Sequence, residues 1–220
     1  MKTSFKTNGG FTLVELLSVI LIVGVLAAIL IPVVGRARAS AAVVECSSNL
    51  RAIHRGFTLY SQENKQRAYP AVTGNALPSG SGATTGTWML ALQTGGYLDN
   101  KDVQLEQGKR NVFVCPSAFD TYPGGLPRRT YIMNSLLVGQ LSAIIPARLA
   151  LPAQTLLLAD GRDSGSGEGD SILSFTRVNY ESRIDYRHGE GFNALFVDGR
   201  VEKLPKGEPR LLAYVDNVNQ

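Results

Sequence analysis

The residue best suited to chemistry in this sequence is His188, because the chain has two histidines and the other, His54, falls in a predicted amphipathic helix. His188 could join Asp160 and Asp198 in a small metal or hydrogen-bonded site, since Asp160 ends one predicted strand and Asp198 begins a predicted hairpin turn. The simpler interpretation is structural: His188 bonds a turn carbonyl or a carboxylate and holds the hairpin. A hydrolase triad would depend on this one base, and the sequence contains no Gly-x-Ser-x-Gly elbow, phosphate loop or zinc spacing.

The two cysteines, Cys46 and Cys115, have a spacing that fits no zinc pattern. An even pair in an exported domain is most simply a disulfide. Closing a loop of that length contributes on the order of 4 kcal/mol in the chain-entropy account. Two unpaired buried thiols are the alternative.

An acidic loop, DGRDSGSGEGD at residues 160–170, contains four carboxylates: Asp160, Asp163, Glu168 and Asp170. Hard oxygen ligands on a glycine-rich loop could hold Ca²⁺, although the spacing is not that of an EF-hand. A solvated acidic loop is the simpler interpretation. We therefore expect no cofactor, with calcium as the open alternative.

The N-terminal segment is almost entirely apolar from Phe11 to Ile31, with Glu15 as its one charge. Its 21 residues would form a helix of roughly 31 Å, about the thickness of the hydrocarbon core of a bilayer. A carboxylate at the bilayer centre costs up to about 3 kcal/mol, so such a residue normally has a partner. The alternative is an interfacial glutamate that interacts with the helix dipole.

Gly9 and Gly10 separate a short basic leader from this apolar segment, which reverses the order found in secretory signal peptides. The stretch KTNGG followed by FTLVELLSVILIVGVLAAILIP resembles the class III signal of type IV prepilins and type II secretion pseudopilins. The resemblance rests on Gly10, Phe11, Thr12, Leu13, Glu15 and Pro32.

The resemblance implies that prepilin peptidase cuts after Gly10, that the new amine of Phe11 is methylated, and that the helix stays in the inner membrane until assembly. It places the N-terminus in the cytoplasm and the head in the periplasm, and after assembly in a periplasmic or cell-surface filament. Glu15 would pair with the Phe11 amine of a neighbouring subunit, neutralising both charges. Calcium in the head would be in keeping with major pseudopilins as a class.

Beyond Pro32, which should kink or locally open the helix, the pattern becomes amphipathic. One stripe recurs at steps of four and three and predicts a helix to about Asn64, with a polar opposite face. The stripe is Cys46, Leu50, Ile53, Phe57 and Tyr60, and the polar face is Ser48, Arg51, Arg55 and Gln62. The predicted organisation is a leader at 1–10, a transmembrane and amphipathic helix at 11–64, and a globular head at 65–220.

In the head, a short helix is predicted over Thr87–Thr94, with Trp88 as a core anchor. Short runs of branched and aromatic residues bounded by Pro, Gly and Asp predict an antiparallel sheet covering one helix, hence an α+β fold. These runs are VFVC at 112–115, TYIM at 130–133, TLLLA at 155–159, ILSF at 172–175, NALFV at 193–197 and VEKL at 201–204.

The most defined local feature is NALFVDGRVEKL, in which Asp198-Gly199 predicts a hairpin with a type I′ turn. The string RHGEGFNALFVDG, with nine residues between His188 and Asp198, resembles the His-x9-Asp-Gly signature of a prepilin-processing-associated domain. Other pieces resemble the same family: CSSNLRAIHRGFTLYSQENKQRAYP, FVCPS, TYIMN and TLLLADGR.

The formal net charge of +4 falls to +2 without Lys2 and Lys6, so no nucleic-acid partner is expected. The leading hypothesis is a structural, non-enzymatic subunit of a type IV pilus-like or type II secretion pseudopilus-like filament. Its partners would be prepilin peptidase, homologous pilin or pseudopilin subunits and an inner-membrane assembly platform. The alternatives are a membrane-tethered minor pilin or adhesin that binds through loops at 73–86 and 160–170, and a signal-anchored enzyme.

Overall fold

The computed structural model describes most of the long N-terminal helix and of the sheet in the head. The chain divides into two compact units, Met1–Ala41 and Ala42–Gln220. The described residues are 13–63, 69–70, 88–98, 110–121, 130–134, 143–144, 146–162, 174–175 and 177–217.

Helix α1 runs from Leu13 to Glu63 and remains helical through Pro32. Before Gly35 its large apolar side chains are all exposed, from 46% at Val34 to 79% at Leu13. The most apolar window of the helix has a mean hydropathy of 3.1, and none of it is buried within the chain. By length and composition this helix can cross a membrane.

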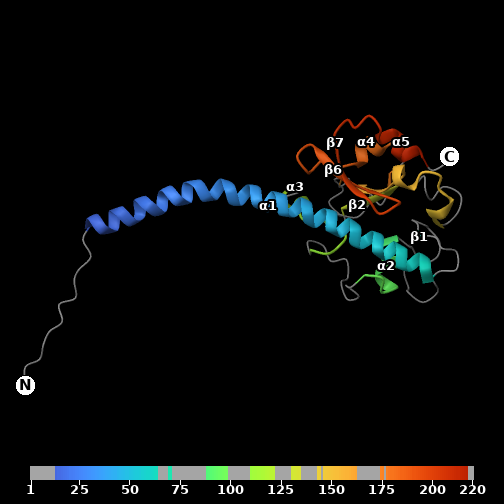
Figure 1. The fold of residues 1–220 in the computed structure, drawn as a ribbon, viewed down its shortest axis with the longest axis horizontal. Coiled ribbons are helices and arrows are strands. Elements are labelled where there is room, and N and C mark those ends of the chain that lie inside the picture. The colour runs from blue at the N-terminus through green and yellow to red at the C-terminus, as the bar shows by residue number, and fades with distance from the viewer. Residues whose placement is uncertain are drawn as a thin grey trace, which may run out of the picture. The chain divides into compact units, whose positions relative to one another are not determined.

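The later part of α1 buries one face in the head (Figure 1). The buried residues are Cys46, Leu50, Ile53, Gly56 and Phe57, while Tyr60 is partly buried against the same core. The opposite face, Ser48, Arg51, Arg55 and Gln62, is exposed. The amphipathic stripe predicted from the sequence is therefore confirmed, and the helix ends one residue before the predicted boundary.

Among the described residues, the main sheet has five strands in the order β5-β2-β4-β6-β7. Its four longer strands pair antiparallel, as expected: β2 (Tyr131–Asn134), β4 (Leu156–Asp160), β6 (Gly191–Phe196) and β7 (Val201–Pro205). The two-residue β5 (Ser174–Phe175) pairs with β2 in parallel. A separate antiparallel pair joins β1 (Tyr69–Pro70) to β3 (Ala143–Ile144). The predicted α+β class, a long helix on a small antiparallel sheet, is confirmed.

Alternating residues of the strands face two separate cores. In β2, Tyr131 and Met133 pack with α1 and with helix α2 (Trp88–Thr94), whereas Ile132 packs on the other side with α5 (Leu211–Asp216). Trp88 is fully buried, as predicted for a core anchor. The sequence predicts a helix on one face of the sheet only, and α5 on the second face was not predicted. The short helices α3 (Ser117–Thr121) and α4 (Tyr180–Arg183) and two 3-10 turns, Pro146–Arg148 and Pro152–Gln154, complete the described elements.

The run VFVC at 112–115, predicted as a strand, forms turns instead. The side chain of Asn111 explains the difference: its Oδ1 accepts a hydrogen bond from Phe113 N at 2.8 Å, and Asn111 O accepts one from Val114 N at 3.1 Å. Such local bonds compete with a strand ladder. The apolar side chains at 113–115 are still buried, so their hydrophobicity marks the core and not a strand.

The hairpin at Asp198-Gly199 is present, but its turn is not type I′. Gly199 N donates to Phe196 O at 3.0 Å, which makes Val197 and Asp198 the central residues, and neither has a positive φ. Gly199 follows with φ of 91°, the arrangement of a three-residue hairpin loop.

A tight turn with two left-handed residues does occur, at the opposite end of β6. Gly189 (φ 57°) and Glu190 (φ 60°) follow His188, whose N–H donates to Gly191 O at 3.0 Å. Positive φ at both central positions is the mark of a type I′ turn. A glutamate in this conformation is strained by about 1 kcal/mol. The contacts around the turn that links His188 to β6 must therefore hold it in place.

Candidate functional site

The two cysteines of the chain are joined in a disulfide between α1 and the segment that precedes α3. Cys46 and Cys115 are both fully buried, with their Cα atoms 4.9 Å apart and a sequence separation of 69. The bond therefore ties the amphipathic part of α1 to the head from inside the core.

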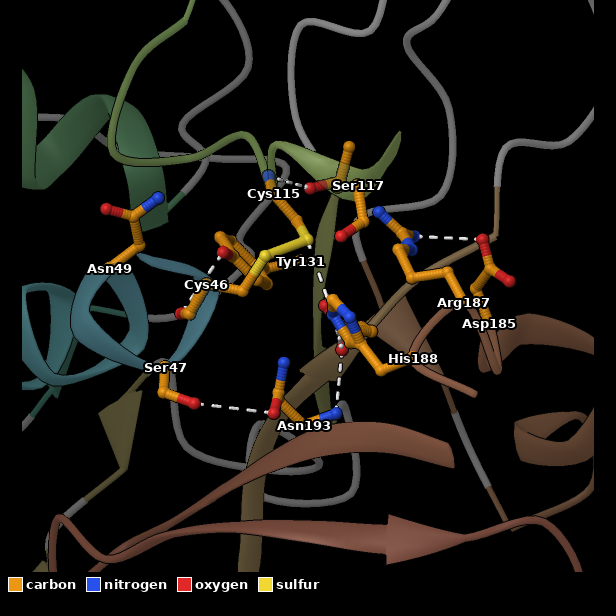
Figure 2. Close-up of polar contacts among 12 residues, drawn as sticks. Cys46, Ser47, Asn49, Cys115, Ser117, Tyr131, Asp185, Arg187, His188 and Asn193 are labelled. Atoms are coloured by element: carbon orange, nitrogen blue, oxygen red, sulfur yellow. Dashed lines mark hydrogen bonds and ion pairs between the residues drawn. A yellow bond between two sulfur atoms is a disulfide. The ribbon is translucent and has the colours of Figure 1, made fainter. Parts of the chain in front are cut away.

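His188 lies directly against this disulfide (Figure 2). Its Nε2 is 3.4 Å from Cys115 Sγ and 3.2 Å from Asp160 Oδ2. The His188 side chain is 1% exposed and that of Asp160 is fully buried. Asp160 Oδ2 also accepts a hydrogen bond from Asn193 N at 2.7 Å, so the carboxylate bridges the end of β4 to β6 and to the turn before it.

A second buried ion pair adjoins the first. Arg187 Nη2 lies 3.1 Å from Asp185 Oδ2 and also donates to Gly161 O, and the arginine side chain is fully buried. The cluster places two carboxyl groups, those of Asp160 and Asp185, against two basic side chains, those of His188 and Arg187. Charges buried in this way are tolerated when they are paired, and removing one partner is costly.

Several buried polar atoms of this cluster lack a hydrogen-bond partner within the described part of the chain. They are Asp160 Oδ1, His188 Nδ1, Arg187 Nε and Nη1, and Asn193 Nδ2; Trp88 Nε1 is another, and belongs to the hydrophobic core. A buried unpaired donor or acceptor costs about 1–3 kcal/mol. Their concentration around one histidine and one disulfide marks this interior as the most unusual chemical environment in the described chain.

The other histidine, His54 on α1, packs against the chain at the opposite end of β6. His54 Nε2 lies 3.1 Å from Val197 O and 3.3 Å from Tyr69 Oη. The His54 ring packs so closely on the hairpin that a Cβ at Gly199 would come within 2.7 Å of its Cε1. Burial lowers the pKa of His54, while the Val197 carbonyl and the Asp198 carboxylate act in the opposite direction.

Asp198, at this same end, is exposed and accepts a hydrogen bond from Arg200 N at 3.0 Å. The possible three-residue site of His188, Asp160 and Asp198 is therefore not formed: the structure pairs His188 with Asp160 and places Asp198 beyond the far end of β6. The 6 residues of this strand separate the two groups, a span of roughly 20 Å. The local reason is that an extended strand carries the residues at its two ends apart.

Of the four carboxylates considered as calcium ligands, the structure describes Asp160. Asp160 turns inward and its Oδ2 is bonded to His188 and Asn193. Asp163, Glu168 and Asp170 lie outside the described residues.

Of the residues predicted for processing and assembly, Gly10 and Phe11 also lie outside the described residues. Glu15 lies in the first turn of α1, where its carbonyl accepts a hydrogen bond from Ser18 Oγ at 2.9 Å.

Sequence reasoning missed four members of the buried cluster: Asp185, Arg187, Asn193 and Tyr131. Tyr131 donates from its hydroxyl to Cys46 O at 3.3 Å, and its complete burial raises its pKa well above the usual value. Charged residues normally face solvent, so neither Asp185 nor Arg187 carried a signal of burial. The position of Tyr131 in an apolar strand run was the one available clue.

Comparison with known families gives a match at the start of the chain. Residues 5–31 match the family described as the prokaryotic N-terminal methylation motif. Comparisons with curated proteins and with solved structures found no match. The motif indicates a type IV pilin-like, prepilin-processed protein, and the apolar start of α1, which lies within it, fits a membrane-anchored protein of this kind.

Proposed function

We propose that this chain is a structural, non-enzymatic subunit of a type IV pilus-like or type II secretion pseudopilus-like filament. The main support is that the methylation motif at 5–31 overlaps the part of α1 whose apolar side chains are exposed. Such a surface needs lipid around it before assembly and the helices of other subunits afterwards.

In this proposal prepilin peptidase cuts after Gly10 and the amine of Phe11 is methylated. The precursor crosses the inner membrane once, with its N-terminus in the cytoplasm and its head in the periplasm. Within the filament, Glu15 pairs with the Phe11 amine of a neighbouring subunit, which removes the cost of a carboxylate in an apolar environment and sets the axial stagger between helices. An inner-membrane assembly platform would drive the transfer from membrane to filament.

The head is proposed to be a prepilin-processing-associated domain of the His-x9-Asp-Gly type. The support is the position of the two ends of the motif, His188 and Gly199. His188 lies against Cys115, which is bonded to Cys46 of α1, and Gly199 lies against His54 of α1, so the chain is tied to α1 just beyond each end of β6. In this proposal the motif fastens the sheet to the helix at two points, which lets the head move as one body with the amphipathic part of α1 during assembly.

The proposal is tested by replacing Gly10 with valine in the producing cell. Full-length precursor should accumulate in the membrane fraction, and mass spectrometry should find no methylated Phe11 at a new N-terminus. Gly24→Ala is the control, because no atom lies within 4 Å of a Cβ at that site, and its processing should be normal. Normal cleavage of the Gly10→Val protein would contradict the proposal.

Glu15→Leu separates processing from assembly. This protein should insert and be cleaved, yet yield few or no filaments, because the amine of the neighbouring subunit loses its carboxylate. Ser18→Ala, one turn away, is the control for changing the same helix surface. Filaments of normal abundance from Glu15→Leu would remove the pairing role of Glu15 and leave the processing result intact.

A membrane-tethered minor pilin or adhesin is the second candidate. It shares the processing and the anchor, so abundance distinguishes the two. A main subunit should dominate purified filaments, whereas a binding subunit at the tip should be scarce in the same preparation.

A further inference from the structure

We propose that Cys46, Cys115, His188 and Asp160 form a zinc site when the disulfide is reduced. The same residues would then join α1 to the head in two ways, through a covalent bond in the oxidised chain and through a metal ion in the reduced one. This inference does not depend on filament formation.

Three of the four ligand atoms already lie close together, and Asp160 adjoins one of them. One ligand atom each from Cys46, Cys115 and His188 lie within 4.8 Å of one another. Zinc bonds of about 2.0–2.3 Å place neighbouring ligand atoms roughly 3.3–3.8 Å apart. His188 Nε2 is 3.4 Å from Cys115 Sγ and 3.2 Å from Asp160 Oδ2, so two edges of the tetrahedron have nearly the required length.

Reduction lets the two sulfur atoms move apart to the separation that a tetrahedral metal site requires. The sulfur atoms are now 2.08 Å apart and bonded to each other, so the oxidised pair offers no thiolate to a metal. A dithiol reductant transfers two electrons and two protons to the disulfide, giving two thiols, and is itself oxidised to a disulfide. Two unbonded sulfur atoms then separate to roughly 3.6–4.0 Å, the range of ordinary van der Waals contact. Zinc binding releases the two thiol protons to solvent.

The surroundings suit a closed structural site. All four side chains are buried and come from separate elements: α1, the segment before α3, the end of β4 and the turn before β6. Two thiolates and one carboxylate against a divalent ion leave a net charge of −1, between that of centres with two cysteines and two histidines and that of centres with four cysteines. Asp160 Oδ1 is buried and unpartnered in the described structure, so this carboxylate has a bonding oxygen that the oxidised core does not use.

The test uses the full chain purified in detergent, reduced with dithiothreitol, freed of reductant under argon and titrated with Co²⁺ and then Zn²⁺. We expect one equivalent of metal per chain, thiolate-to-cobalt charge-transfer absorption, visible bands of tetrahedral cobalt, and displacement of cobalt by zinc. The oxidised chain should show none of these signals. Absence of stoichiometric binding by the reduced chain, or equal binding by the oxidised chain, would overturn the proposal.

Variants identify the ligands. His188→Gln and Asp160→Asn should each weaken zinc binding by more than about 100-fold, beyond the range typical of residues that only orient a ligand. His54→Gln, at the other end of β6, should bind as the wild type does. Since His188 and Asp160 support the fold, the variant with both Cys46→Ser and Cys115→Ser is the second test. It keeps the histidine and aspartate and must lose the cobalt-thiolate absorption; retention of stoichiometric zinc binding by this variant would refute the site.

Discussion

The two ends of β6 fasten the sheet to the same helix by different physical means. At the first end, a disulfide and the buried pair of His188 and Asp160 are enclosed in the core. At the second end, the half-buried His54 ring contacts a backbone carbonyl and covers Gly199. Interactions in a dry interior are costly to break, whereas those near solvent are screened and replaceable. The first end should therefore dominate the stability of the head.

Asp160→Ala should produce the largest loss. It leaves His188 and the N–H of Asn193 without their buried acceptor, and breaking such a pair costs about 3–5 kcal/mol. Urea unfolding of the oxidised protein measures the change. Asp198→Ala is the matched control at the second end, where only an exposed bond to Arg200 N is lost, and should cost about 1 kcal/mol or less. Equal losses from the two variants would abolish the distinction between the ends.

Replacing both cysteines with alanine should cost about 4 kcal/mol in the chain-entropy account of a long closed loop. Reductant, with a chelator present, should lower the urea midpoint of the wild type toward that of the variant. The same reductant should leave the variant unchanged. If the variant unfolds at the wild-type midpoint, the covalent bond is not what secures the first end.

Gly199→Ala tests the second end and should cost about 1–3 kcal/mol. Part of the cost is strain at φ of 91°, and the rest is the approach of the new Cβ to within 2.7 Å of His54. Gly207→Ala is a matched control, because its φ is 78° and no atom lies within 4 Å of its Cβ, so it should show the strain alone. A double variant with His54→Ala should recover the difference; equal costs at 199 and 207 would mean that the ring moves aside freely.

The features predictable from the sequence were those with local causes. The helical stripe from Cys46 to Phe57 follows from the 3.6-residue period, and the hairpin at Gly199 follows from strand runs on either side of a turn signal. The failure at 112–115 came from one side chain, Asn111, whose hydrogen bonds compete with a strand. A propensity argument sees the apolar run and not that competition.

The buried cluster could be predicted only in parts: the sequence indicated a disulfide and a contact of His188 with a carboxylate, but not that these groups meet. Its members at 46, 115, 160 and 188 come from four elements, and only the pairing of strands β4 and β6 brings Asp160 to His188. The sequence offered both Asp160 and Asp198 as partners of His188, and the fold joins His188 to Asp160 and to Cys115. The apolar start of α1 is the opposite case, since its composition and its motif both lie in one continuous segment.

The smallest expected effect is the pH dependence of the second end. Burial holds the pKa of His54 in the folded head below its ordinary value of 6.5, although the Val197 carbonyl and Asp198 oppose the shift. The unfolded chain then binds the proton more readily, so the contribution of His54 to stability is complete above about pH 6.5, declines as the pH falls below it, and levels off below the folded-state pKa. Partial exposure of the ring keeps this change small. Comparing urea midpoints across this window for the wild type and His54→Gln isolates the effect, and an identical pH slope in both proteins would assign the titration to another group.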